Sequence, residues 1–189
     1  MHPAVADFVA ACEQAIAATE DVADRVIAIA PLMQALTARA DEFLEPGHVR
    51  EDPAHYARNA VHICPDGRLS LFALVWRPGQ WTPVHDHGTW GVVGVLRGLL
   101  EERAYMSATG EIRADHGIHL KRGGIVLLNP GAVTTFVPNP DHIHMTGVPD
   151  DRPTCVSLHL YGRNMNSFHV YDPAAGTRRL IEVAHHQVR

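Results

Sequence analysis

Three groups of side chains beyond residue 80 could do chemistry together, and in each group the polar residues recur at every second position. His85 and His87 are separated by one residue, and so are His142 and His144. In the third group, Ser157–Tyr161, the order S-L-H-L-Y alternates polar side chains with leucines. Because successive side chains of a β-strand point to opposite faces, the polar members of each group would share one face.

These residue types suit a metal centre with a hydrogen-bonded support. Two imidazoles on one rigid strand face supply much of a divalent metal site, and imidazole binds iron, zinc, copper and nickel. Ser157, His159 and Tyr161 in one row can form a relay in which each group orients the next. Such a row opposite a row of leucines fits a barrel whose interior holds a site. The alternative is a buried polar row that the backbone satisfies.

The chain after residue 55 has the sequence pattern of a β domain. Short runs of β-forming residues alternate with turn sequences at intervals of about 8 to 12 residues, which is typical of a sandwich or small barrel. One predicted turn is Gly123-Gly124. The pattern favours a mainly β fold, a single jelly-roll barrel. We expect strands at 60–64, 69–76, 82–87, 90–97, 99–106, 112–120, 125–129, 133–138, 143–147, 154–161 and 168–171.

A helical region precedes the strands. Apolar residues in Pro3–Phe43 recur at helical spacing, which predicts amphipathic helices, with Pro31 as a break or a first-turn residue. A Pro-Gly pair then ends the region. We therefore expect an N-terminal helical segment at 1–45 that packs on the barrel, and a barrel domain at 46–189.

Composition excludes several classes of partner. The chain has 189 residues, a net charge of −5 and no run of Lys or Arg, which argues against binding to nucleic acid or anionic membranes. Its three cysteines are scattered, which predicts neither a disulfide framework nor a thiolate zinc site and fits a reducing cytoplasm. The first residues lack the pattern of a secretory leader, and no stretch has the apolar length of a membrane span. We therefore expect a cytoplasmic protein. The 14 histidines are more than packing requires.

The histidine pair lies in a recognisable frame. The order G-x5-H-x-H over Gly79–His87, then G-x5-P over Gly124–Pro130 and a later histidine, resembles the two motifs of the cupin superfamily. Cupins usually have a glutamate three or four residues after His-x-His, where this chain has Gly91 and Val92. A cupin without that carboxylate, and with S-L-H-L-Y after its last histidine, is similar to the thiol dioxygenases, specifically the cysteine dioxygenase family. The resemblance covers about residues 50–172.

The resemblance implies an Fe(II) site with three histidine ligands. By position these are His85, His87 and His144, because Ser157 lies thirteen residues beyond His144, as in the family. His142 would point the same way in a regular strand and stays open as the third ligand. Three neutral imidazoles would leave coordination positions of iron free for a thiol substrate and O2.

The resemblance also implies roles for the groups around the metal. Ser157, His159 and Tyr161 match the outer relay of the family, and the string Y-A-R-N supplies Tyr56 and Arg58, of which Arg58 would bind a substrate carboxylate. Animal members join a cysteine just past His-x-His to the relay tyrosine. The corresponding segment 88–94 has no cysteine, which predicts an uncross-linked Tyr161.

The implied reaction is insertion of both atoms of O2 into the thiol of L-cysteine, which gives cysteine sulfinic acid. Relatives that prefer 3-mercaptopropionate carry glutamine at the Arg58 position and a later arginine, and Arg163 follows Tyr161 too closely to match that arginine. This favours cysteine, with 3-mercaptopropionate or another mercapto acid, such as mercaptosuccinate, as the alternative.

Two other classes stay open beside the thiol dioxygenase. One is a metal-binding cupin without catalysis, such as a ligand sensor, which has no chemical need for the row at Ser157–Tyr161. The other is a zinc or manganese isomerase on the same fold, against which the missing carboxylate argues. The expected partners are a small thiol and O2, and the expected state is a monomer or a weak homo-oligomer.

Overall fold

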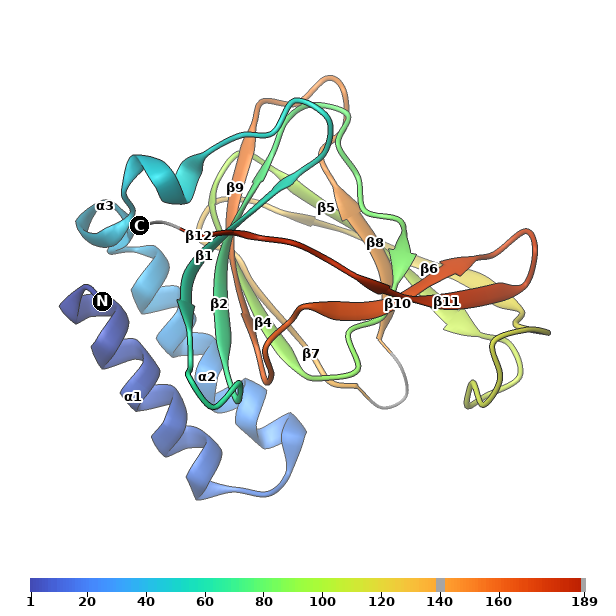
Figure 1. The fold of residues 1–189 in the computed structure, drawn as a ribbon, viewed down its shortest axis with the longest axis horizontal. Helices are drawn as coiled ribbons and strands as arrows, with labels where there is room; N and C mark the ends of the chain where they lie inside the picture. Colours follow the sequence, from blue (N-terminus) through green and yellow to red (C-terminus); the bar gives the residue numbers. More distant parts are fainter. Residues whose placement is uncertain (139–141, 188–189) are drawn as a thin grey trace.

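Two six-stranded β-sheets face each other and form a barrel, to which helices are added at the N-terminus (Figure 1). The computed structural model describes residues 1–138 and 142–187. The first sheet has the order β12 (His186–Gln187), β1 (Ala57–Ile63), β2 (Ser70–Trp76), β9 (Cys155–Tyr161), β4 (Gly91–Arg97) and β7 (Val133–Phe136). The second has the order β11 (Thr177–Glu182), β10 (Ser167–Asp172), β3 (Val84–His85), β8 (Ile143–Gly147), β5 (Leu100–Ser107) and β6 (Leu120–Leu128). The expected mainly β jelly-roll barrel with an N-terminal helical segment is confirmed.

The helices lie along the outer side of the first sheet, as Figure 1 shows for α1 and α2. They are α1 (Pro3–Ala18), α2 (Val22–Thr37), α3 (Ala40–Phe43) and the 3-10 turn η1 (Pro46–Val49). The prediction that Pro31 is a break or a first-turn residue is wrong, because Pro31 lies in the interior of α2. Proline removes the hydrogen bond to the carbonyl four residues earlier, here that of Ile27. Both residues are exposed, so the defect faces solvent and the helix continues.

The helices explain why the central strands are buried on both faces. In β9, Leu158 and Leu160 pack in one apolar cluster with Ile29 and Met33 of α2. The alternate residues of β9 face the interior of the barrel, where Phe72 of β2 also lies. The leucine row therefore forms a second core beneath the helices, and the polar row is left to the barrel interior.

Two features of the second sheet differ from expectation. No strand forms at 112–118 within the described chain, and the predicted turn at Gly123-Gly124 lies inside β6. Gly123 sits where the β5–β6 register shifts, and a Cβ there would lie 3.2 Å from Cβ of Ala104. The two glycines thus mark an irregular strand rather than a turn.

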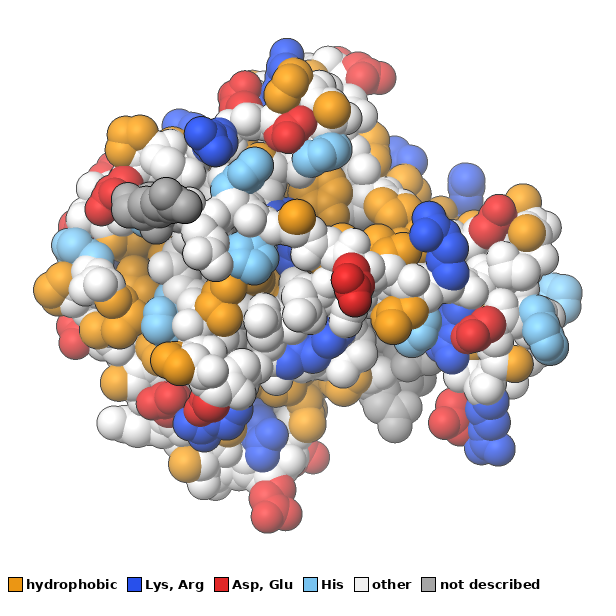
Figure 2. All heavy atoms as spheres, in the orientation of Figure 1, with side chains coloured by type: hydrophobic (Ala, Val, Ile, Leu, Met, Phe, Trp, Pro, Cys, Tyr) orange, Lys and Arg blue, Asp and Glu red, His pale blue; other side chains and the backbone are white. Residues whose placement is uncertain are grey.

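The charge distribution on the surface and the length of the helices relate to the predicted absence of nucleic-acid and membrane partners. Over the face in Figure 2, acidic and basic side chains are interspersed. In the described part of the chain, no helix has the length and apolar character needed to cross a membrane.

Candidate active site

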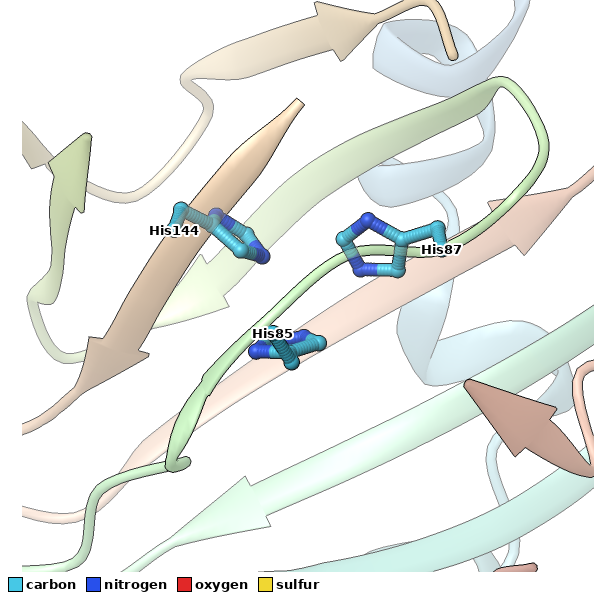
Figure 3. A group of neighbouring side chains, drawn as sticks. All are labelled: His85, His87 and His144. Carbon is cyan, nitrogen blue, oxygen red and sulfur yellow. The ribbon is translucent and has the colours of Figure 1, made fainter. Parts of the chain in front are cut away.

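His85, His87 and His144 meet in the interior of the barrel. His85 belongs to β3, His87 follows it, and His144 is the register partner of His85 on β8. Figure 3 shows the three rings turned toward one another. Their potential ligand atoms all lie within 4.8 Å of one another, and all three residues are buried. The antiparallel β3–β8 pairing thus completes a site that spacing alone leaves as two separate pairs.

The chemistry of this group fits a bound metal ion. Burial lowers the pKa of His85 and His87 well below its ordinary value and also lowers that of His144, so the rings are neutral. His85 Nδ1 lies 3.0 Å from the carbonyl oxygen of Pro83, which fixes Nδ1 as the donor and leaves Nε2 as a ligand. Among the described residues, both ring nitrogens of His144 and Nδ1 of His87 are buried without a hydrogen-bond partner. Orphaned imidazole nitrogens are what a metal would satisfy.

His142 points to a different partner. Its Nε2 lies 3.1 Å from Oε1 of Glu102, and its ring stacks on Phe136 with centroids 4.7 Å apart. Glu102 Oε1 also lies 3.5 Å from Nδ1 of His144. Burial alone would raise the pKa of Glu102, but the two histidines lower it well below its usual range, so Glu102 is a carboxylate. The structure therefore brings His144 to His85 and His87, and it also places His142 and Glu102 next to His144 in a second group of potential ligands.

The polar row of β9 forms a continuous chain of hydrogen bonds. Ser157 Oγ lies 2.9 Å from His159 Nε2, and His159 Nδ1 lies 3.2 Å from the hydroxyl of Tyr161. Trp76 Nε1, which can only donate, lies 3.0 Å from Ser157 Oγ. Ser157 can then give its own proton to Nε2 of His159, which leaves Nδ1–H to donate to the oxygen of Tyr161. The Tyr161 proton is thereby free to point into the cavity.

Burial keeps this row neutral. It lowers the pKa of His159 to about 3 and raises that of Tyr161 well above its usual range. Neither group therefore changes charge near neutral pH.

Replacement of Ser157 by alanine is expected to destabilise the protein by about 1–3 kcal/mol, the cost of buried polar groups left without partners. The change removes the acceptor of Trp76 Nε1 and the partner of His159 Nε2. Chemical denaturation of the two proteins measures the difference. Ser107→Ala, in an exposed pair with Thr109, is the control. An unchanged midpoint for Ser157→Ala would show that the row carries no such constraint.

Arg58 and Tyr56 lie beside the histidines. Arg58 is 8% exposed, and its Nη2 donates to the carbonyl oxygen of Met165 at 2.5 Å. Its Nη1 is buried without a hydrogen-bond partner in the described chain. The Tyr56 ring stacks on Trp76 at 4.5 Å. One cavity joins these groups to the histidines and the row; its lining includes Tyr56, Arg58, Trp76, His85, His87, His144, His159, Tyr161, Met165 and Phe168.

Gly91, one of the two positions where other cupins carry a carboxylate, is filled by a neighbour's ring. Gly91 pairs with Phe136 on one side and Tyr161 on the other. A Cβ at Gly91 would lie 2.3 Å from Cζ of Phe136, and that ring stacks on His87 with centroids 4.3 Å apart. An aromatic wall thus replaces a carboxylate next to the histidines. Since the residue opposite Tyr161 has no side chain, this register also supports the prediction of an uncross-linked tyrosine.

Substitution of Gly91 by alanine is therefore expected to push Phe136 out of place and to destabilise the protein by about 1–3 kcal/mol, as overpacking does. The loss would appear as a lower midpoint of urea unfolding. Gly124→Ala is the control, because a Cβ there meets nothing within 4 Å. Equal effects of the two substitutions would contradict the close packing at Gly91.

Asp86 and Arg163 stabilise the segment that carries His85 and His87. Asp86 accepts hydrogen bonds from the Tyr171 hydroxyl at 2.8 Å and from the backbone N–H of His169 at 3.1 Å, so it faces away from the three histidines. Arg163 donates to the carbonyl oxygens of His87 and Ser167. Arg163 therefore supports the backbone next to the site and is absent from the lining of the cavity in the described residues.

Several residues of the site gave no sequence signal. Trp76 anchors the polar row by donating from its indole nitrogen to Ser157. Met165 acts through its backbone carbonyl, and Glu102 lies on a strand whose register with β8 cannot be derived from spacing. Only the inward phase of Trp76 on β2 could have been deduced.

The chain is similar to several solved structures and matches one family model. A protein from Thermus thermophilus (TM-score 0.44, 17% identity) covers 61% of this chain and 90% of its own length. The match to a protein with a double-stranded β-helix domain from Klebsiella pneumoniae has a TM-score of 0.44 and 16% identity, and it covers 76% of this chain and 95% of that protein. The match to a cupin-like protein from Thermotoga maritima has a TM-score of 0.42 and 15% identity, and it covers 74% of this chain and 87% of that protein. The family model for cysteine dioxygenase type I matches residues 3–174. The chain therefore belongs to the cysteine dioxygenase type I family.

Proposed function

We propose that this protein is a non-haem Fe(II) thiol dioxygenase that acts on L-cysteine. The observation that carries the proposal is a single cavity lined by three histidines, a buried arginine with a free nitrogen, and a neutral tyrosine. Both atoms of O2 pass to the thiol sulfur, which is oxidised as O2 is reduced, and the product is cysteine sulfinic acid. Membership of the family supports the reaction class.

His85, His87 and His144 would hold the metal through neutral imidazole nitrogens. A ferrous ion there would supply the redox partner for O2 and favour the thiolate form of the substrate. Because the three imidazoles are neutral, they would not offset the positive charge of the ion, which could then attract a thiolate. The ring of Phe136 fills the space next to Gly91 and excludes a fourth protein ligand there.

Arg58 and Tyr161 position the substrate from the other side. Arg58 would donate to the carboxylate, a charge-assisted bond that fixes the orientation of the thiol. Tyr161 would offer its hydroxyl proton to the reacting atoms, because His159 occupies its oxygen from the other side. Ser157 holds the tautomer of His159 that makes this possible.

Oxygen consumption tests this proposal. Anaerobic protein reconstituted with Fe(II) is given L-cysteine, 3-mercaptopropionate and mercaptosuccinate in parallel, and O2 uptake is compared with sulfinate formed. We expect one sulfinate per O2 and the highest kcat/KM with L-cysteine. No uptake with any thiol, despite one bound iron per chain, would overturn the dioxygenase and leave a sensor cupin in its place.

A mercapto acid is the second candidate substrate. Arg58 recognises a carboxylate and would accept that of 3-mercaptopropionate as well. The same assay separates the two, because a preference for 3-mercaptopropionate would reassign the substrate without changing the reaction class. A cytoplasmic location and a monomeric or weakly oligomeric state stay predictions.

A further inference from the structure

The end of the chain returns to the site. After β11 the backbone crosses the barrel and adds β12 in parallel beside β1 (Figure 1). His186 pairs with Asn59 in this register. His185, one residue earlier, is therefore level with Arg58 on the neighbouring strand. Side chains at the same level of paired strands point to the same face.

His185 and Arg58 share two sets of surroundings. The His185 ring packs edge-on against Phe72 with centroids 5.3 Å apart, and Cζ of Arg58 lies 4.9 Å from the centroid of the same ring. Both residues, with Tyr56, line a cleft of about 460 Å³ outside the histidine cavity. Tyr56 and Arg58 line both spaces, so these two residues lie between the cleft and the histidine cavity.

Each of these two side chains has a buried nitrogen without a partner. Within the described residues, Nη1 of Arg58 and Nδ1 of His185 make no hydrogen bond, although both are inaccessible to solvent. The other terminal nitrogen of Arg58 already donates to the carbonyl of Met165. The guanidinium is thus partly engaged, and a carboxylate bound there can accept a further hydrogen bond from a neighbouring donor.

We propose that His185 is a substrate-binding residue that donates from Nδ1 to the same carboxylate that Arg58 binds. The inference rests on the proposed function, because it specifies how a carboxylated thiol is recognised at that site. It favours a single carboxylate, since Asp52 and Glu182 also line the cleft and would repel a second anion. Burial, and to a lesser extent the charge of Arg58, lowers the pKa of His185. The neutral ring can therefore donate one N–H without charge repulsion from the guanidinium.

Binding measurements under anaerobic conditions test the role of His185. Calorimetry on the Fe(II)-loaded protein gives the Kd of L-cysteine and of cysteamine, which has the same thiol and amine but no carboxylate. We expect His185→Ala to raise the Kd of L-cysteine at least about tenfold and to leave that of cysteamine unchanged, because hydrogen bonds to charged groups are strong. His185→Asn, whose side-chain N–H can replace Nδ1, should restore much of the affinity. His119→Ala, in an exposed loop, is the matched control.

The outcomes separate this inference from the proposed function. Equal losses for both thiols, or no loss for L-cysteine, would overturn the role of His185 even if O2 uptake is normal. Loss of the preference for carboxylate in His185→Ala would support that role even if no thiol is oxidised. A wild-type protein that binds L-cysteine no better than cysteamine would refute it outright. Iron content and melting temperature of each variant show whether the barrel is intact.

Discussion

Replacement of His144 by alanine is expected to abolish stoichiometric iron binding and, with it, thiol oxidation. Loss of a partner that only orients a ligand already costs about 10–100-fold in metal affinity, so removal of a ligand should exceed 100-fold. His144 is buried, and neither of its ring nitrogens has a hydrogen-bond partner among the described residues. The measurement is iron per chain after dialysis against a chelator of known affinity.

The matched control is His142→Ala, because His142 lies two residues away and offers the same chemistry. Its Nε2 is directed to Glu102 and its ring stacks on Phe136, although the ring centroid lies 4.6 Å from that of His144. We expect the His142→Ala protein to bind nearly one iron per chain. Its loss of iron affinity should be at most about tenfold, which is the lower limit of the 10–100-fold loss typical of residues that support metal ligands. If His142→Ala loses the metal and His144→Ala retains it, the third ligand is His142 and the proposed set is wrong.

Substitution of Arg58 by glutamine is expected to lower kcat/KM for L-cysteine by about 100-fold. A hydrogen bond to a charged group contributes about 1.5–3 kcal/mol, which corresponds to roughly 10- to 150-fold in rate. The reason is that Arg58, on β1, brings a positive charge to the lining of the cavity, whereas glutamine is polar but shorter and uncharged. Steady-state O2 uptake with L-cysteine and cysteamine measures the effect, which should be small for cysteamine.

Arg179→Gln is the control for the loss of an arginine, because Arg179 is exposed on β11. It should leave the kinetics unchanged. The Arg58 assignment fails if turnover of L-cysteine survives Arg58→Gln while that of 3-mercaptopropionate falls. Such a result would place the carboxylate elsewhere in the cleft without changing the metal site.

Much of this site follows from the spacing of residues in the sequence. The alternation at Ser157–Tyr161 determines that three polar groups share a face opposite two leucines, and the structure has this arrangement. The phase of a strand is a local property, because it depends only on backbone geometry. The same reasoning yields the fold class and the orientation of His85 and His87 on one side of their segment.

Tertiary structure decided which faces meet. The β3–β8 register brings His144 rather than His142 to the other two histidines, and the β4–β7 pairing puts Phe136 in the space over Gly91. The parallel pairing of β12 with β1 brings His185 level with Arg58, more than a hundred residues away in the chain. Each of these depends on contacts between distant segments, and local spacing has no information about register between strands. Residue types and their phase are therefore set by the sequence pattern, whereas the partners of each residue are set by how the strands pair.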